Sequence, residues 1–95
     1  MIVLYNVILK PSVEKDLRSL PKSAIARVWK HIEAMKITPL PRQAVKLEGG
    51  KQLYRIRVGD YRIVYGVDNE AKQVTVYYVR HRREVYRKLG AKRYP

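Results

Sequence analysis

The chain has 95 residues, which suffices for one domain with a modest hydrophobic core and is too short for two. Its 21 lysines and arginines outnumber 8 acidic residues and give a net charge of +13, which is typical of domains that bind a polyanion. The sequence has no cysteine and no apolar run near the ~20 residues that span a membrane, which excludes disulfides, thiolate metal sites and a membrane helix. We expect a single cytoplasmic domain over residues 1–95.

The first third of the chain predicts one strand followed by two helices. The apolar run IVLYNVIL (2–9) favours a strand over a signal peptide, because a charged lead and a small-residue cleavage site are missing. A first helix is predicted to begin at Pro11, since proline is favoured at the first helical position. Its apolar positions at helical spacing are Val13, Leu17 and Leu20. A second helix is predicted from about Lys22, and its apolar stripe comprises Ile25, Val28, Trp29, Ile32 and Met35.

The rest of the chain predicts a sheet. Residues 36–45 contain two prolines and are expected to form a loop. Three strands are predicted, separated by Gly59-Asp60 and by the turn NEAK, and they cover residues 51–58, 61–68 and 73–80. A short helix is expected around 83–89. The order β-α-α-β-β-β predicts an α+β fold, in which an N-terminal strand and a three-stranded antiparallel meander form one sheet, and a helical hairpin covers one face of it. The other face is left open.

Arginines gather on the predicted meander. Arg55 and Arg57 share one face of a strand, because successive side chains alternate between faces, and Arg62 follows across the turn. The basic groups that we expect to join them are Lys51, Arg80, His81, Arg82, Arg83 and Arg87, with Tyr86 beside them. Clustered guanidinium groups repel one another, and phosphate relieves that repulsion because arginine grips it as a bidentate fork. The alternative is an ordinary solvated face with the guanidinium groups splayed apart.

The residue types predict RNA chemistry without a metal or a cofactor. The sequence lacks metal-spaced ligand clusters, a glycine-rich phosphate loop and a Ser/His/Asp pattern, and its acids are scattered. RNA carries its own nucleophile, the 2′-OH, whose attack on the adjacent phosphate needs a proton acceptor, stabilisation of charge and a proton donor for the leaving oxygen. Arginines can stabilise the charge but are poor bases, because their pKa lies above ~12. Either Tyr86 or His81 could transfer the protons.

The element order and two stretches of sequence resemble the RelE/ParE superfamily of toxin–antitoxin toxins. These stretches are KLEGGKQLYRIRVGDYRIVYGVD (46–68) and VRHRREVY (79–86), and together they resemble the RelE branch in particular. The resemblance implies a microbial-ribonuclease-like fold and a toxin that cuts mRNA in the ribosomal A site, without a metal, leaving a 2′,3′-cyclic phosphate. It also implies three partners: an acidic antitoxin, the ribosome and mRNA.

The resemblance extends to single residues. Arg55 and Arg57 match two basic positions that are lysines in the best-known member, while Tyr86 matches the tyrosine proposed as acid or base. Arginine in place of lysine keeps the charge but removes a group that could lose a proton, which puts more weight on Tyr86 and His81. With the residue analysis above, this predicts catalysis by Arg57, Arg62, His81, Arg82 and Tyr86. Phosphate or RNA binding is predicted for Lys51, Arg55, Arg80, Arg83 and Arg87.

Two other functions are compatible with the same fold. A ParE-like inhibitor of DNA gyrase would bind without cleaving RNA, although that branch typically lacks the full set of basic residues and tyrosine. A catalytically inactive homologue would bind RNA through its arginines and transfer no proton. The favoured prediction is a type II toxin that inhibits translation as a ribosome-dependent mRNA endoribonuclease.

Overall fold

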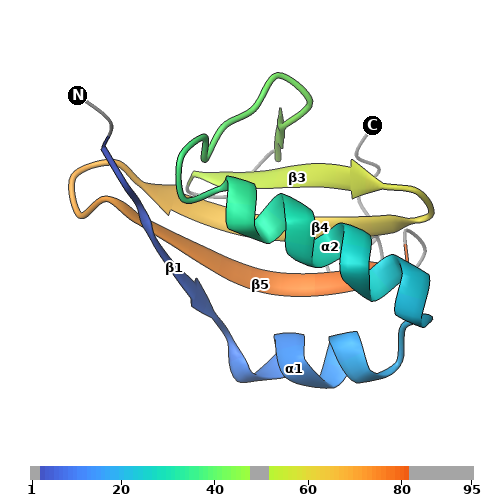
Figure 1. Ribbon diagram of the computed structural model, residues 1–95. Helices are drawn as coiled ribbons and strands as arrows, with labels where there is room; N and C mark the ends of the chain where they lie inside the picture. Colours follow the sequence, from blue (N-terminus) through green and yellow to red (C-terminus); the bar gives the residue numbers. More distant parts are fainter. Residues whose placement is uncertain (1–2, 48–51, 82–95) are drawn as a thin grey trace.

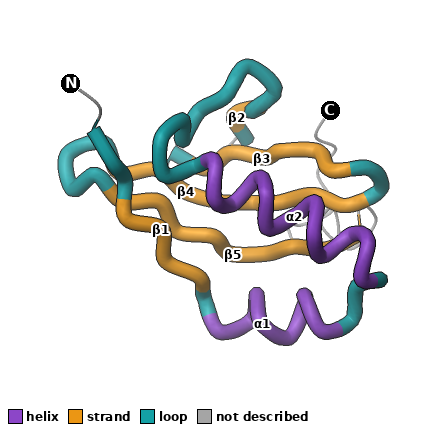
Figure 2. The backbone as a smooth tube through the Cα atoms, in the orientation of Figure 1, coloured by secondary structure: helices purple, strands orange, loops and turns teal. Residues whose placement is uncertain are grey.

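The computed structural model describes residues 3–47 and 52–81 (Figure 1). The elements in chain order are β1 (Asn6–Leu9), α1 (Pro11–Arg18), α2 (Lys22–Ala34), β2 (Val45–Lys46), β3 (Leu53–Val58), β4 (Tyr61–Asp68) and β5 (Gln73–His81). The five strands form one sheet in the order β1-β5-β4-β3-β2. β1 runs parallel to β5, and the other neighbours are antiparallel. The predicted α+β architecture is therefore confirmed, with the helices and the sheet in two layers (Figure 2).

Apart from shifts of one or two residues at the strand ends, the boundaries differ from the prediction at two places. The short strand β2 lies at the end of the segment expected to be a loop, where it pairs with β3. The N-terminal strand is shorter than its apolar run, because β1 pairs only with the stretch of β5 that begins at Gln73. Val3 and Leu4 precede that stretch and are 49% and 65% exposed. The helix expected around 83–89 lies outside the described residues.

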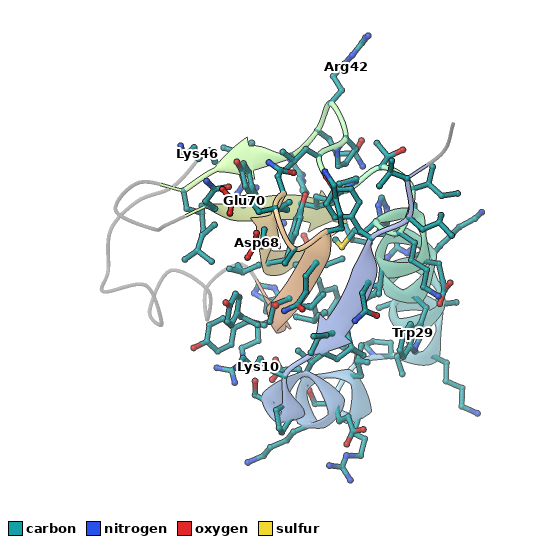
Figure 3. The ribbon with its side chains drawn as sticks, turned by 90° about the vertical axis from the view of Figure 1, so that its left-hand side faces the viewer. Lys10, Trp29, Arg42, Lys46, Asp68 and Glu70 are labelled. Atoms are coloured by element: carbon teal, nitrogen blue, oxygen red, sulfur yellow. The ribbon has the colours of Figure 1, made fainter. Side chains whose placement is uncertain are left out.

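One hydrophobic core fills the space between the helices and the sheet. Val13 and Leu17 of α1 pack there with residues of α2 and with alternate residues of the strands. The buried positions of α2 are Ala24, Val28, Ile32 and Met35. The prediction was wrong for Trp29, which is 38% exposed on α2 (labelled in Figure 3). Trp29 follows Val28 and is rotated by about 100° around the helix axis, which takes it off this narrow stripe.

Tyr65 places a polar group inside this core. Its ring is completely buried on β4, and its hydroxyl donates a hydrogen bond of 2.7 Å to the carbonyl oxygen of Pro39. Burial raises the pKa of Tyr65, and the neighbouring Tyr54 raises it further. The loop after α2 is thereby tied to the centre of the sheet, since Pro39 belongs to that loop.

The face of the sheet opposite the helices carries a register shift. Tyr65 pairs with Val76 and Val64 pairs with Tyr78, so that Tyr77 is an extra residue in β5. Such a β-bulge breaks the strict alternation of side chains along a strand. On this face, which the described helices leave uncovered and which we call the open face, Tyr78 packs with Val64 and Tyr77 lies beside Gly66. The bulge therefore gives this face two consecutive tyrosines.

Side chains of α1 complete the outer edge of β5. β1 pairs with β5 only as far as Val76, and no other strand of the described residues borders the second half of β5 on that side. Ser12 donates its hydroxyl to the carbonyl oxygen of Tyr77 at 3.0 Å, and the backbone N–H of Val79 donates to Asp16 Oδ2 at 3.1 Å. These bonds satisfy edge groups that would otherwise need water or another strand.

Candidate functional site

Three arginines lie in line across the open face of the sheet. Arg57 on β3 pairs directly with Arg62 on β4, and Arg62 pairs directly with Arg80 on β5. Directly opposed residues on neighbouring strands project from the same face, and strands lie about 4.8 Å apart. We call Arg57, Arg62 and Arg80 the arginine row. The strand register thus brings together three of the residues that the sequence predicted to converge.

The β3–β4 turn orients two members of the row. The carbonyl oxygen of Gly59 accepts hydrogen bonds from Nε of Arg57 at 3.4 Å and from Nη1 of Arg62 at 3.1 Å. Gly59 has a φ of +60°, a conformation that glycine adopts without strain. Arg62 is only 5% exposed and also donates to the carbonyl oxygen of Tyr61 at 3.0 Å, whereas Arg57 is exposed. The buried guanidinium of Arg62 is therefore held in place by the backbone, next to the exposed guanidinium of Arg57.

Arg27 approaches the same turn from α2. Its Nη2 atom lies 3.2 Å from the position that a Cβ would occupy at Gly59. Arg27 does not belong to the apolar stripe predicted for this helix, and nothing in the helical pattern indicates that it reaches the hairpin. The cationic end of the sheet consequently includes a residue of the helical layer.

Arg55 lies two residues before Arg57 on the same strand and the same face. It pairs with Val45 on β2 and with Val64 on β4, and it is 6% exposed. Its Nε atom is buried and has no hydrogen-bond partner within residues 3–47 and 52–81. A buried guanidinium N–H that lacks a partner is costly, because it has lost water without a replacement. An anion on this face would supply an acceptor.

Asp16 of α1 holds the third member of the row. Its Oδ1 atom accepts a hydrogen bond of 2.9 Å from Nε of Arg80, and Asp16 is 8% exposed. The guanidinium carbon of Arg80 also lies 4.8 Å from the centroid of the Tyr78 ring. Part of the charge of Arg80 is therefore already compensated inside the protein. Sequence analysis missed Asp16, although an acid among the apolar positions of α1 was the available signal.

His81 lies on the other face. It pairs with Tyr61, one residue away from the Arg62–Arg80 pair, and neighbouring residues of a strand point to opposite faces. The two rings meet edge to face with centroids 5.9 Å apart. Ser19, Leu20 and Arg80 line a cavity of about 270 Å³ together with these two rings. His81 is therefore directed to the face opposite Arg57 and Arg62, although it lines one cavity with Arg80.

The family of the chain follows from its comparison with known proteins. The family model for the "ParE toxin of type II toxin-antitoxin system, parDE" matches residues 7–86. The candidate toxin RelE1 of Methanocaldococcus jannaschii is 30% identical over 94 residues, which cover 96% of this chain and 98% of that protein. The chain belongs to the RelE/ParE superfamily of type II toxins.

Solved structures of RelE proteins share the fold of this RelE/ParE toxin. The RelE of the archaeal RelE–RelB complex from Pyrococcus horikoshii is 34% identical with a TM-score of 0.75, over 83% of this chain and 96% of that chain. The toxin–antitoxin complex RelBE2 from Mycobacterium tuberculosis gives 29% identity and a TM-score of 0.74, over 84% of this chain and 100% of that chain. The isolated RelE toxin of E. coli is 27% identical with a TM-score of 0.69, over 90% of this chain and 94% of that chain.

Half of the predicted site residues of this RelE/ParE toxin lie outside the described residues. They are Lys51, Arg82, Arg83, Tyr86 and Arg87.

The described part contains no group of three or more His, Asp or Glu side chains that could hold a metal ion. Within the same part, no helix has the length and hydropathy needed to cross a membrane.

Proposed function

We propose that this chain is a ribosome-dependent mRNA endoribonuclease that cleaves in the A site and so inhibits translation. The observation that supports it is the arginine row, in which Arg57, Arg62 and Arg80 occupy directly opposed positions on three adjacent strands. Arg55 adds a buried Nε without a partner among the described residues on the same face. This arrangement suits a phosphodiester that gains negative charge during the reaction. An enzyme that acts on translating ribosomes works in the cytoplasm.

The proposed reaction is an in-line displacement at phosphorus. The 2′-oxygen forms a bond to phosphorus while the bond to the 5′-oxygen breaks, which yields a 2′,3′-cyclic phosphate and a free 5′-hydroxyl. One proton leaves the 2′-OH and one reaches the departing 5′-oxygen. Arg62, whose guanidinium is fixed by two backbone carbonyl oxygens, stabilises the charge on the non-bridging oxygens.

Tyr86 is the proposed proton-transfer group. The position of His81 on the helix-covered face supports this assignment, because a base must lie within hydrogen-bond reach of the proton that it moves. Neighbouring arginines favour the anionic form of a tyrosine and make it a better base. Arg82, which matches the family's arginine at the end of the last strand, is proposed to share in the stabilisation of charge.

The proposed partner in the resting state is an acidic antitoxin. The solved relatives include RelE–RelB complexes, and the chain carries a net charge of +13. An acidic segment laid across the open face would satisfy the exposed guanidinium groups and cover the phosphate site. Association with such a partner is expected to slow as salt rises, since exposed charges are screened over about 8–10 Å at physiological ionic strength.

The test is single-turnover cleavage of mRNA on programmed ribosomes. We expect cleavage that leaves a 2′,3′-cyclic phosphate and that stops when the nucleotide before the cleaved bond is replaced by its 2′-deoxy form. Tyr86→Phe is expected to slow cleavage by about 10²–10⁴-fold while ribosome binding persists. Cleavage of the 2′-deoxy substrate would refute the proposed nucleophile, and unchanged cleavage by the Phe variant would remove Tyr86 from the mechanism.

Gyrase inhibition is the second candidate, because the matching family model is that of the ParE toxin. A protein of this kind would block DNA supercoiling by gyrase and leave ribosome-bound mRNA intact. Measuring both activities with the same preparation separates the two functions. Inhibition of supercoiling without any mRNA cleavage would replace the proposed function by this one.

A further inference from the structure

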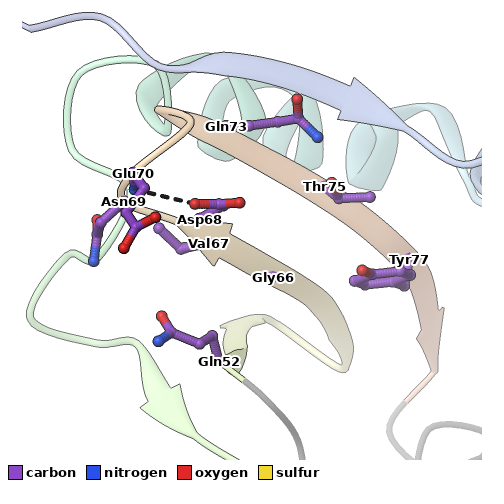
Figure 4. A pocket seen from close by; sticks show the side chains of 9 residues that line it. All are labelled: Gln52, Gly66, Val67, Asp68, Asn69, Glu70, Gln73, Thr75 and Tyr77. Atoms are coloured by element: carbon purple, nitrogen blue, oxygen red, sulfur yellow. Dashed lines mark hydrogen bonds between the residues drawn. The ribbon is translucent and has the colours of Figure 1, made fainter.

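The two ends of the open face carry opposite charge. Where β4 passes into β5, a cavity of about 560 Å³ is bordered by the carboxylates of Asp68 and Glu70 (Figure 4). No lysine or arginine belongs to the described lining of this cavity. At the other end, Arg57 and Arg62 stand on either side of the β3–β4 turn, and both donate to the carbonyl oxygen of Gly59. A polyanion on this face is therefore repelled by the first end and attracted by the second.

A third guanidinium group reaches the same turn from the helical layer. The first half of α2 lies at the end of the molecule that carries the β3–β4 turn (Figure 1). Arg27 belongs to this half, and its Nη2 and Nη1 atoms lie 3.2 and 3.5 Å from the position that a Cβ would occupy at Gly59. The guanidinium therefore lies directly against the backbone of the turn, in space that the side chain of any other residue type at position 59 would fill.

The charge of Arg27 is not compensated within the part of the chain that the structure describes. Arg27 is exposed, and its guanidinium forms no hydrogen bond or ion pair with residues 3–47 or 52–81. Asp60, which follows Gly59 in the turn, is also exposed and forms no ion pair with those residues. Three like charges around one turn repel one another. An anion that accepts from Arg27 relieves this repulsion, and a guanidinium group can bind phosphate through two parallel N–H groups.

Gly59 separates Arg27 from the arginine row. Its carbonyl oxygen accepts from Arg57 and Arg62, whereas Arg27 approaches the side of its Cα at which a side chain would be attached. Standard bond lengths then place Nη2 of Arg27 at most about 10 Å from Nη1 of Arg62. Arg27 is therefore within reach of a short stretch of RNA backbone that starts on the row, but it lies on another side of the turn.

We propose that Arg27 and the β3–β4 turn form a second phosphate-binding site, outside the open face. An RNA strand with one phosphate on the arginine row passes around this turn toward α2, because the acidic end of the face repels it in the other direction. The site binds the backbone of the strand and does not read its bases. As a path for mRNA the site rests on the proposed function, whereas phosphate binding at Arg27 does not require that the protein cleaves RNA.

The first measurement is the salt dependence of RNA binding by the full chain, without ribosomes and without cleavage. The probe is a 2′-O-methylated single-stranded oligonucleotide, followed by fluorescence anisotropy. Arg27→Met keeps an unbranched apolar stem and removes the charge, and it is expected to reduce the slope of log affinity against log salt by about 0.7. Arg27→Lys keeps the charge and is expected to retain the slope. An unchanged slope for Arg27→Met would overturn the proposal.

The matched control is Arg42→Met. Arg42 is exposed and projects outward from the loop after α2 (labelled in Figure 3). This variant lowers the net charge of the chain by the same amount as Arg27→Met, and the slope is expected to stay unchanged. Equal reductions of the slope by the two variants would show that Arg27 contributes only to the net charge, and they would refute a site at the turn.

A probe with a single phosphate tests whether this site is separate from the arginine row. The probe is a 2′-O-methylated dinucleotide with one phosphodiester and no terminal phosphate, and its affinity is measured by NMR titration. Because its phosphate binds the row, we expect Arg57→Gln to weaken binding and Arg27→Met to leave the affinity unchanged. Equal weakening by the two variants would assign Arg27 to the row and overturn the second site.

Ribosomal RNA is the other source of a phosphate at this turn, and binding to ribosomes that carry no mRNA distinguishes the two sources. If Arg27→Met weakened this binding but left the oligonucleotide slope unchanged, the phosphate would belong to ribosomal RNA and the proposed path of the strand would fall. If Arg27→Met reduced the oligonucleotide slope in a protein that cleaves no mRNA, the proposed function would fail while the site at Arg27 would stand.

Discussion

Both faces of β4 contain buried side chains, but only the open face buries a charged one. Ile63 and Tyr65 are fully buried toward the helices, and Arg62 on the other face is 5% exposed, about the same as Val58 in the core. On the helix-covered face, burial removes apolar surface from water and stabilises the fold. On the open face, burial fixes a guanidinium group between backbone carbonyl oxygens. Exposure alone therefore does not distinguish the core of this protein from its candidate site, whereas the chemistry of the neighbours does.

The largest expected effect concerns the fixed arginine of the open face. Arg62→Ala should lower the single-turnover cleavage rate on programmed ribosomes by about 10²–10³-fold, because a preorganised group that stabilises developing charge is lost. Lys15→Ala, which removes an exposed cation of α1, should leave the rate unchanged. Equal rates for the two variants would mean that the buried arginine is structural, and the distinction between the faces would fail.

Asp16 joins the two faces at the edge of β5, and its loss should destabilise the fold. Asp16→Ala leaves the N–H of Val79 and the guanidinium of Arg80 without their acceptor, and we expect the free energy of unfolding to fall by about 3 kcal/mol. The exposed ion pair of Lys36 with Glu33 is the control. Glu33→Ala should cost about 0–1 kcal/mol. If chemical denaturation gave equal losses of unfolding free energy for Asp16→Ala and Glu33→Ala, the hydrogen bonds of Asp16 would add nothing to stability.

The two ends of the open face should differ in how they respond to salt. Arg57→Gln should reduce the slope of log affinity against log salt by about 0.7 for single-stranded RNA, because one phosphate contact disappears. Glu70→Gln, in the turn between β4 and β5 at the other end of this face, should leave that slope unchanged. Fluorescence anisotropy with a 2′-O-methylated oligonucleotide measures both without cleavage. If the slope changed for Glu70→Gln instead, the RNA backbone would lie beside the turn that carries Asp68 and Glu70.

The smallest expected effect lies on the helix-covered face and appears only at alkaline pH. The pKa of Tyr65 is raised in the folded state, so the native protein keeps this proton above pH ~10 while the unfolded chain loses it. Stability is therefore lost as pH rises above about 10, by at most about 1.4 kcal/mol per pH unit. Tyr65→Phe should be less stable at neutral pH, because its bond to Pro39 is gone, but should decline less steeply. If the free energy of unfolding fell equally steeply with pH in the native protein and in Tyr65→Phe, this prediction would be contradicted.

Much of the fold could be predicted because local patterns and tertiary structure agree. Period-two alternation and the Gly59-Asp60 turn predicted the β3–β4 hairpin, and the helical spacing of apolar residues predicted both helices. The alternation also placed Arg55 and Arg57 on one face. What local patterns do not contain is the pairing of distant segments. Val3 and Leu4 are apolar but find no partner strand, and the direct opposition of Arg62 and Arg80 depends on the register between β4 and β5.

The missed features are the ones in which a residue breaks the pattern around it. Asp16 is a charged residue on an apolar helix stripe, and its partner lies more than sixty residues away in β5. The consecutive tyrosines 77 and 78 interrupt an alternating strand, and Gly66 is a glycine inside one. Each looks unfavourable when considered alone, and each is explained by a contact with another element. For His81, alternation along the strand already indicates a side chain on the face opposite that of Arg80, because the two residues are neighbours on β5.

The parallel pairing of β1 with β5 sets the time at which this protein can fold as it is made. Asn6 lies opposite Gln73, so the first strand has no neighbour until β5, some sixty residues later in the chain, has left the ribosome. Antiparallel hairpins such as β3–β4 need only nearby residues and can form earlier. The arginine row is also incomplete until Arg80 emerges. The sheet is therefore unfinished until β5 has been made, and the face that carries the arginine row is completed only at that point.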